Sequence, residues 1–299
     1  MYLEPDVHLG WRHRPGFYEF YSPFKHGNAV MTFDRNGSRR NILATSTVPA
    51  ALWLFGCSFV EGFSLSNEET FAWDLASRFK GEYAVVNFGT AGYGTYQSLL
   101  LMKQKLQEQS ALGLITPKWI GYLLNDFHEP RNTGAYSFMR LLSPPKGGKI
   151  PLLPYCKLDR EGSLSCDYAA AEVIWSISWY SRVVALINEA YFTFTLRSRN
   201  QNGETVTGQL IKQMHELAQG ANSRFGVILF ALSAEKKANY ERFLRGAGIE
   251  FVDCDREERL SPEFSLPDGH PNAAMNKLIA QCVDAYLRTS VISQAGGIR

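Results

Sequence analysis

Five short apolar segments, separated by amphipathic segments, dominate the hydrophobic pattern from residue 50 onward. We predict a buried β-strand at each, because strands covered on both faces read as uninterrupted apolar runs. The predicted strands are 51–55, 83–87, 118–124, 225–230 and 249–254. Apolar residues at helical spacing predict helices between them, over about 71–79, 95–109, 205–219 and 236–245, and a last helix that ends near 287.

This alternation of strands and helices predicts a parallel sheet with helices on both faces. The fold class that we expect is therefore α/β, a flavodoxin-like α/β/α sandwich with a five-stranded parallel sheet. The spacing of Ser66 and Glu69 is that of a capping box and predicts the start of the first helix. We expect residues 1–299 to form a single domain.

Residues 1–48 lack helical periodicity and contain one short alternating run, 29–33, bounded by turn-forming residues. We predict an N-terminal arm or small hairpin that packs on the domain. Five arginines of this segment are expected to form a solvated face: Arg12, Arg14, Arg35, Arg39 and Arg40.

Residues 127–200 interrupt the alternation after the third strand, and we interpret them as an insertion and a candidate lid. Within the insertion we predict a hairpin around 157–164 and an aromatic-rich helical stretch over about 169–197. Its aromatic residues are expected to pack as a core, with a sugar-stacking platform as the alternative: Trp175, Trp179, Tyr180, Tyr191 and Phe192.

Composition narrows the function classes. The 299 residues hold 31 Lys and Arg against 29 Asp and Glu, a near balance that argues against a nucleic-acid-binding protein dominated by phosphate contacts. Five cysteines without a CxxC pair argue against a zinc ribbon or a dense disulfide framework. No apolar run is long enough for a membrane span, and the first residues do not read as a signal peptide. We expect a cytoplasmic protein as the sequence stands, or a periplasmic or secreted one if it has been trimmed.

Reactive side chains follow the predicted strands at the ends where parallel sheets bind ligands. Ser58 follows the first strand, a glycine loop containing Gly92 follows the second, and Asn125 follows the third. Asp268 and His270 follow the fifth strand and a loop. Together they supply a nucleophile, oxyanion donors, an orienting carboxylate and a base, the inventory of a serine acyl-transfer site.

These residues resemble the conserved blocks of the SGNH (GDSL-type) hydrolase family. Its first block corresponds to 56–62 (GCSFVEG), its second to the loop that ends at Gly92, its third to 123–126 (LLND) and its fifth to 268–272 (DGHPN). The blocks occur in the family order and span about 215 residues. Two positions differ from the usual pattern, because Cys57 replaces an aspartate and Leu123 replaces a glycine.

The resemblance implies a serine esterase. Ser58 would attack the ester carbonyl, His270 would act as general base and Asp268 would orient the imidazole. The Ser58 N–H, the Gly92 N–H and the Asn125 amide would form the oxyanion hole. We expect an O-acetyl ester of a carbohydrate as substrate, partly because an acid two residues before the histidine resembles the polysaccharide-modifying branches of the family.

Several alternatives stay open at this point. The same residues would serve an O-acyltransferase with a saccharide acceptor, and an inactive binding protein could keep the fold. Cys57 could act as a thiolate nucleophile, although its neutral interpretation is a small apolar filler. Thioester hydrolysis and phospholipid hydrolysis rank lower, because we expect no long exposed apolar helix.

We expect neither a cofactor nor a metal. The glycine loop at 89–94 lacks the dinucleotide-binding order of glycines, and no P-loop lysine is present. His128 and Glu129 have no second histidine at ligand spacing, so we expect them at the mouth of the cleft or in solvent. The partners that we expect are a small-molecule or saccharide ester, with no nucleic acid; the oligomeric state is not predicted.

Overall fold

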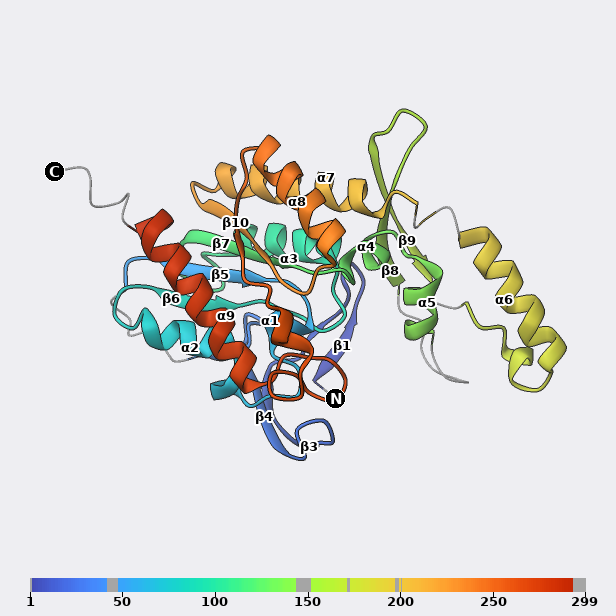
Figure 1. Cartoon of the computed structure of the whole chain (residues 1–299), viewed down its shortest axis with the longest axis horizontal. Helices are drawn as coiled ribbons and strands as arrows, with labels where there is room; N and C mark the ends of the chain where they lie inside the picture. Colours follow the sequence, from blue (N-terminus) through green and yellow to red (C-terminus); the bar gives the residue numbers. More distant parts are fainter. Residues whose placement is uncertain are drawn as a thin grey trace.

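A five-stranded parallel sheet forms the centre of the molecule, in a computed structural model that describes residues 2–41, 48–143, 152–170, 173–196, 199 and 201–292 (Figure 1). Its strands are β5 (Ala51–Phe55), β6 (Ala84–Asn87), β7 (Pro117–Leu124), β10 (Arg224–Leu229) and β11 (Glu250–Asp253). They pair in the order β11-β10-β7-β5-β6, and every pair is parallel. The flavodoxin-like order and all five predicted strands are confirmed.

Helices cover both faces of the sheet, as predicted (Figure 1). On one face, α2 (Phe71–Arg78) and α9 (Ala273–Tyr286) pack together over one apolar core. A π-helical turn, η5 (Leu287–Ile292), continues α9. On the other face, α3 (Thr95–Gln107), α7 (Gly203–Gly220) and α8 (Ala234–Gly246) enclose a second core. The buried strands β5 and β7 contribute alternate side chains to the two cores, which explains their nearly continuous apolar sequence.

The predicted capping box forms, although not on the helix for which it was predicted. Ser66 and Glu69 cap a short 3₁₀ turn, η1 (Asn67–Glu69). The next helix, α2, has its own cap, because the Thr70 hydroxyl accepts a hydrogen bond from the backbone N–H of Trp73. The sequence spacing therefore identified a real cap and missed the break that follows it.

The N-terminal arm consists of two antiparallel hairpins rather than one. β1 (Leu3–Asp6) pairs with β2 (Gly10–His13), and β3 (Gly16–Ser22) pairs with β4 (Gly27–Phe33). The predicted alternating run lies in β4, whose alternate side chains Ala29, Met31 and Phe33 are buried. An isolated bridge between Arg39 and Asn87 connects the arm to the end of β6, so the arm packs on the domain as predicted.

Arg39 corrects the prediction that the arm's arginines form a solvated face. Its side chain is 1% exposed, whereas Arg12, Arg14 and Arg40 lie at the surface in ion pairs with carboxylates of the arm. The Arg39 guanidinium donates to the carbonyl oxygens of residues 61, 62 and 65. Burial lowers its pKa to about 10, which leaves it charged at neutral pH and able to serve these carbonyls.

The predicted insertion is built from short elements that extend from the sheet domain (Figure 1). They are α4 (His128–Asn132), α5 (Tyr136–Leu142), the hairpin of β8 (Leu152–Leu158) and β9 (Leu164–Ala170), the 3₁₀ turn η2 (Ser176–Trp179) and α6 (Arg182–Leu196). The predicted hairpin turns at 159–162, as expected. The predicted helical stretch is corrected, because its first residues belong to β9 and the helix begins only at Arg182.

The aromatic residues of the insertion are not the packed core that we predicted. Phe192 is half-buried and packs against a small core around Phe138, but Trp179 and Tyr191 are 55% and 51% exposed. One face of α6 presents an apolar surface to solvent: Val183, Leu186, Ile187, Tyr191 and Phe194. The expectation that no exposed apolar helix exists was therefore wrong. No helix of the described part of the chain is both long and apolar enough to cross a membrane.

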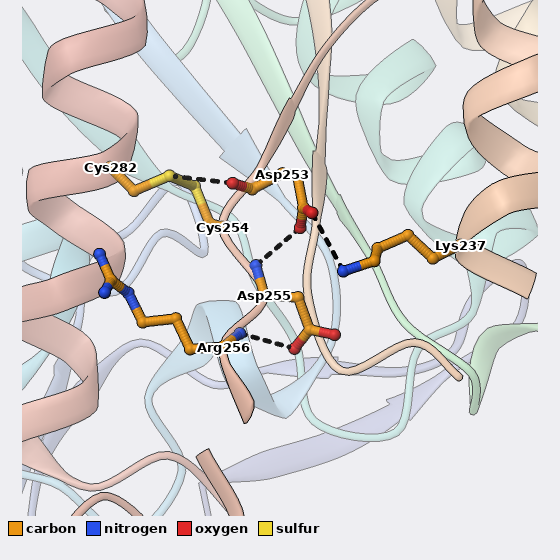
Figure 2. Close-up of a disulfide and its surroundings, with 6 residues drawn as sticks. All are labelled: Lys237, Asp253, Cys254, Asp255, Arg256 and Cys282. Carbon is orange, nitrogen blue, oxygen red and sulfur yellow. Dashed lines mark hydrogen bonds and ion pairs between the residues drawn. A yellow bond between two sulfur atoms is a disulfide. The ribbon is translucent and has the colours of Figure 1, made fainter. Parts of the chain in front are cut away.

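Two disulfides join four of the five cysteines. Cys156–Cys166 links β8 to β9 within the insertion, and Cys254–Cys282 links the end of β11 to α9. Figure 2 shows the second bridge beside Asp253, whose carboxylate pairs with Lys237 at 3.0 Å. These bridges do not amount to a dense framework, yet the sequence spacing did not predict either pairing.

Candidate active site

Ser58 lies where the chain leaves the central sheet and turns sharply into a helix. β5 ends at Phe55, and the short helix α1 (Ser58–Glu61) begins with the serine. Gly56 has a φ of +150°, and a Cβ on it would lie 2.6 Å from the Val60 side chain, so the turn needs a glycine. The first N–H groups of a helix have no partner within the helix, which leaves the Ser58 N–H suited to bind an anion.

A chain of hydrogen bonds joins Ser58, His270 and Asp268. The Ser58 hydroxyl lies 2.9 Å from His270 Nε2, and His270 Nδ1 lies 2.9 Å from Asp268 Oδ2. Because the carboxylate can only accept, Nδ1 carries the proton and Nε2 is free to accept from the serine. The structure thus brings together three of the sequence-predicted residues in the geometry that activates a serine.

A closed turn and two aromatic rings hold His270 in place. The Leu266 N–H donates to the His270 carbonyl at 2.7 Å, and Gly269 takes a φ of +84° inside this turn. The imidazole packs edge-on to Phe59, with ring centroids 5.3 Å apart, and against Phe63 at 4.9 Å. These contacts restrict rotation of the ring, so Nε2 stays directed at Ser58.

Asn125 ends strand β7 beside the residue that precedes the nucleophile. Its side chain is fully buried, and its amide nitrogen donates to the Cys57 sulfur at 3.1 Å. The amide oxygen accepts from the Phe127 N–H at 3.0 Å, which fixes the orientation of the group. An amide nitrogen carries two hydrogens, so one remains for a ligand. Asn125 therefore lies beside Cys57, the residue that precedes the predicted nucleophile, and its oxyanion role stays a prediction.

Gly92 has the backbone conformation of a glycine-specific position, with a φ of +81°. A Cβ on this residue would lie 2.8 Å from the Trp11 indole, which also donates to the Ala91 carbonyl at 2.8 Å. The N-terminal arm thus covers the Gly92 loop, an arrangement that the sequence did not predict. The described contacts do not join Gly92 to Ser58, so its oxyanion role stays a prediction.

Ser58 and His270 open onto a cleft of about 480 Å³. Phe59 and Phe230 form buried parts of its wall, and Arg131 and Arg259 supply charged groups. The rim is apolar, and these residues were not predicted from the sequence: Phe127, Leu141 and Leu260, which are 54%, 83% and 71% exposed. Leu141 belongs to α5, so the insertion contributes directly to the mouth of the cleft.

The expectation for His128 and Glu129 is corrected, because both are buried in α4, the first helix of the insertion. His128 is inaccessible to solvent and its Nδ1 lies 2.6 Å from the Tyr122 hydroxyl. Burial lowers the pKa of His128 well below its usual 6.5. Glu129 accepts from the Tyr240 hydroxyl at 3.0 Å and pairs with Lys236 at 3.0 Å. Within the described ranges, no group of three His, Cys, Asp or Glu side chains could hold a metal ion.

A buried hydrogen bond between a histidine and a glutamate supports the helix of the nucleophile and was missed in the sequence. Glu61, the last residue of α1, is fully buried, and its carboxylate lies 2.6 Å from His13 Nε2. His13 Nδ1 lies 3.0 Å from the Gly37 carbonyl, which can only accept, so this nitrogen carries a proton. Arg39 donates to the Glu61 carbonyl at 2.5 Å. The arm is thereby tied to the short helix that carries Ser58.

Comparisons with known proteins were made by family models, by curated sequences and by solved structures. No family model and no curated protein matches the chain. Among solved structures it is similar to the psychrotrophic esterase EstA from Pseudoalteromonas sp., at 9% identity over 80% of this chain and 97% of that one, with a TM-score of 0.48. A GDSL-like lipase from Bacteroides thetaiotaomicron matches at 15% identity over 83% and 93%, with a TM-score of 0.45.

A further similar structure is a carbohydrate acetylesterase family member from Sinorhizobium meliloti, at 9% identity over 80% of this chain and 98% of that one, with a TM-score of 0.42. Ser58 follows β5, Asn125 follows β7, and His270 lies in the loop between β11 and α9, in the order that the resemblance found in the sequence implies. The chain has a flavodoxin-like α/β fold, with a five-stranded parallel sheet between two layers of helices.

Proposed function

We propose that this protein is a serine ester hydrolase of the SGNH type. The observation that supports the proposal most strongly is the hydrogen-bonded chain from Ser58 through His270 to Asp268. Ser58 and His270 are 212 residues apart in the sequence, so their 2.9 Å contact is a product of the fold and not of local chain geometry.

The proposed reaction begins with attack of the Ser58 hydroxyl on the ester carbonyl, while His270 Nε2 takes the hydroxyl proton. Asp268 stabilises the imidazolium that forms. The carbonyl oxygen becomes an oxyanion, which the Ser58 N–H, the Asn125 amide and the Gly92 N–H would stabilise. The intermediate collapses, and His270 returns the proton to the leaving alcohol. Water then repeats these steps on the acyl-serine to release the acid.

For the substrate we propose a short O-acyl ester, an O-acetyl group on a carbohydrate. Phe59 and Phe230 offer an apolar wall beside the serine for a small acyl group. Asp126, Arg131 and Arg259 line the same cleft and supply the hydrogen-bonding groups that sugar hydroxyls need. The cleft of about 480 Å³ has room for an alcohol much larger than the acyl group.

A second candidate substrate is a lipid ester, and a specific observation favours it. The apolar face of α6 is directed to solvent, and α6 packs beside α5, whose Leu141 forms part of the cleft rim. Glu189 of α6 accepts from the Tyr136 hydroxyl of α5 at 2.8 Å, which ties the two helices together. An exposed apolar helix with aromatic residues, joined to an apolar rim, is suited to a lipid–water interface.

A series of p-nitrophenyl esters of increasing acyl length, each assayed with and without phosphatidylcholine vesicles, tests both candidates. The carbohydrate-ester proposal predicts the highest kcat/KM for the acetate and no effect of vesicles. Preference for long chains together with activation by vesicles would select the lipid candidate. In that case Leu186→Glu on α6 should abolish the activation and leave acetate hydrolysis unchanged.

Absence of hydrolysis of every ester by the wild-type protein would contradict the proposed function. Addition of a saccharide acceptor to the same assay separates hydrolysis from acyl transfer, because transfer would produce an acylated sugar in place of free acid. The inactive variant Ser58→Ala provides the background rate for each substrate.

A further inference from the structure

A second cavity, of about 130 Å³, lies between the N-terminal arm and α3. It shares no lining residue with the cleft that contains Ser58. Arg12 comes from β2, Arg35 and Asn36 come from the turn after β4, and Lys105 comes from α3. Three cationic side chains thus converge on one small space from three separate segments.

Lys105 is the unusual member of this group. Its side chain is only 8% exposed, and its ammonium forms neither a hydrogen bond nor an ion pair with another described residue. The ammonium lies over the Phe88 ring, with Nζ 6.0 Å from the ring centroid. Even partial burial of an ammonium that has no ion-pair partner is costly, because the charge loses part of its hydration. Burial accordingly lowers the pKa of Lys105.

The carboxylates near the cavity are already engaged with other groups. Glu4, which lines the cavity, pairs with Arg12 at 2.9 Å and with Arg14 at 3.3 Å. Glu108 on α3 accepts from the Gln104 amide at 3.1 Å. Asp6 and Glu108 act on Lys105 electrostatically from a distance, and Asp6 also accepts from the N–H groups of His8 and Leu9 at 2.9 Å. Among the described residues neither Lys105 nor Arg35 has an ion-pair partner, so the cationic side chains that line the cavity outnumber its lining carboxylate, Glu4.

We propose that this cavity binds a small oxyanion such as inorganic phosphate. Its volume equals that of about four water molecules at ~30 Å³ each, which suits one tetrahedral ion. Lys105 would supply a charge-assisted hydrogen bond at the closed end. Arg35 is exposed and would contact the bound ion from the side of the cavity that faces solvent.

The position of the cavity gives the bound ion a structural role. Thr90 and Tyr93 also line it, and they flank the loop that carries Gly92. The Tyr93 hydroxyl donates to the Trp11 carbonyl, so the same loop is already joined to the arm. An ion that bridges Lys105 and Arg35 would strengthen the attachment of the arm to this loop. The proposal stands apart from ester hydrolysis, which uses the other cleft.

The proposal is tested by thermal unfolding and calorimetry with inorganic phosphate, with chloride at the same ionic strength as the reference. The wild type should unfold at a higher temperature in phosphate. Lys105→Met should weaken phosphate binding by about tenfold or more, because a charge-assisted hydrogen bond is lost. Lys103→Met, an exposed lysine on the same helix, should bind phosphate as the wild type does.

Two further readouts keep the test decisive. In chloride, Lys105→Met should be at least as stable as the wild type, because methionine fills the site without a buried charge. Arg35→Ala, at an exposed position, should weaken phosphate binding several-fold without loss of folding. An equal response to phosphate in Lys105→Met and the wild type would overturn the proposal, as would a wild type that responds no more to phosphate than to chloride.

Discussion

Removal of the Cys254–Cys282 disulfide should cost a large part of the protein's stability. The bridge closes a segment with a sequence separation of 28 residues, and this segment carries Asp268 and His270. In the chain-entropy model a loop of this length lowers the entropy of the unfolded chain by about 12 cal/mol/K. This corresponds to about 3.6 kcal/mol of unfolding free energy at 25 °C.

The double variant Cys254→Ala/Cys282→Ala should therefore lose about that amount in urea unfolding, with a fall in the midpoint. It should also show a lower kcat, because the segment that positions the imidazole is less constrained. The matched control is Cys156→Ala/Cys166→Ala, which removes the bridge of the outlying hairpin and should leave kcat unchanged. If the wild type, with its bridge verified by mass spectrometry, unfolded at the same urea concentration as the first variant, the reasoning would be refuted.

Three further changes have defined outcomes. Asn125→Ala should lower kcat by about 10²–10³-fold with little change in KM, measured on the preferred ester, because an oxyanion donor is lost; an unchanged kcat would remove Asn125 from the oxyanion hole. His13→Ala should cost about 3–5 kcal/mol in urea unfolding, because Glu61 would remain buried without its partner; a loss below about 1 kcal/mol would contradict this, since that is what an exposed pair contributes. Burial holds the pKa of His128 well below 6.5, so the unfolded state binds more protons and stability falls as the pH drops below 6.5. His128→Gln should reduce this slope by up to about 1.4 kcal/mol per pH unit, and an identical slope in both proteins would show that His128 is not the titrating group.

The sheet could be predicted from the sequence because its strands are buried on both faces. In the segment 51–55 every side chain is buried and none is polar, so the sequence reads as the uninterrupted apolar run that a buried strand predicts. Once the strands are placed, parallel topology brings their carboxyl ends together, and Ser58 and Asn125 follow from that alone. Asp268 and His270 come after a loop, and the resemblance to known blocks was needed to pair them with Ser58.

The sequence predictions that failed concern features set by tertiary contacts, and such contacts leave no local pattern in the sequence. Arg39 is buried because three carbonyl groups meet its guanidinium, and those carbonyls lie more than 20 residues away in the chain. Periodicity marks α6 as an apolar helix but does not reveal whether another element covers it. Cysteine spacing does not reveal that Cys254 and Cys282 meet, because the pairing depends on how β11 and α9 pack.

The central claim is that Ser58 is an activated nucleophile, and labelling with a fluorophosphonate probe tests it most directly. The account predicts one covalent adduct on the wild type, assigned by peptide mass spectrometry to Ser58, and loss of the adduct in Ser58→Ala. Cys57→Ala should still be labelled, because the neighbouring thiol has no covalent role in the proposed reaction. Equal labelling of Ser58→Ala and the wild type, or an adduct on Cys57, would contradict the account.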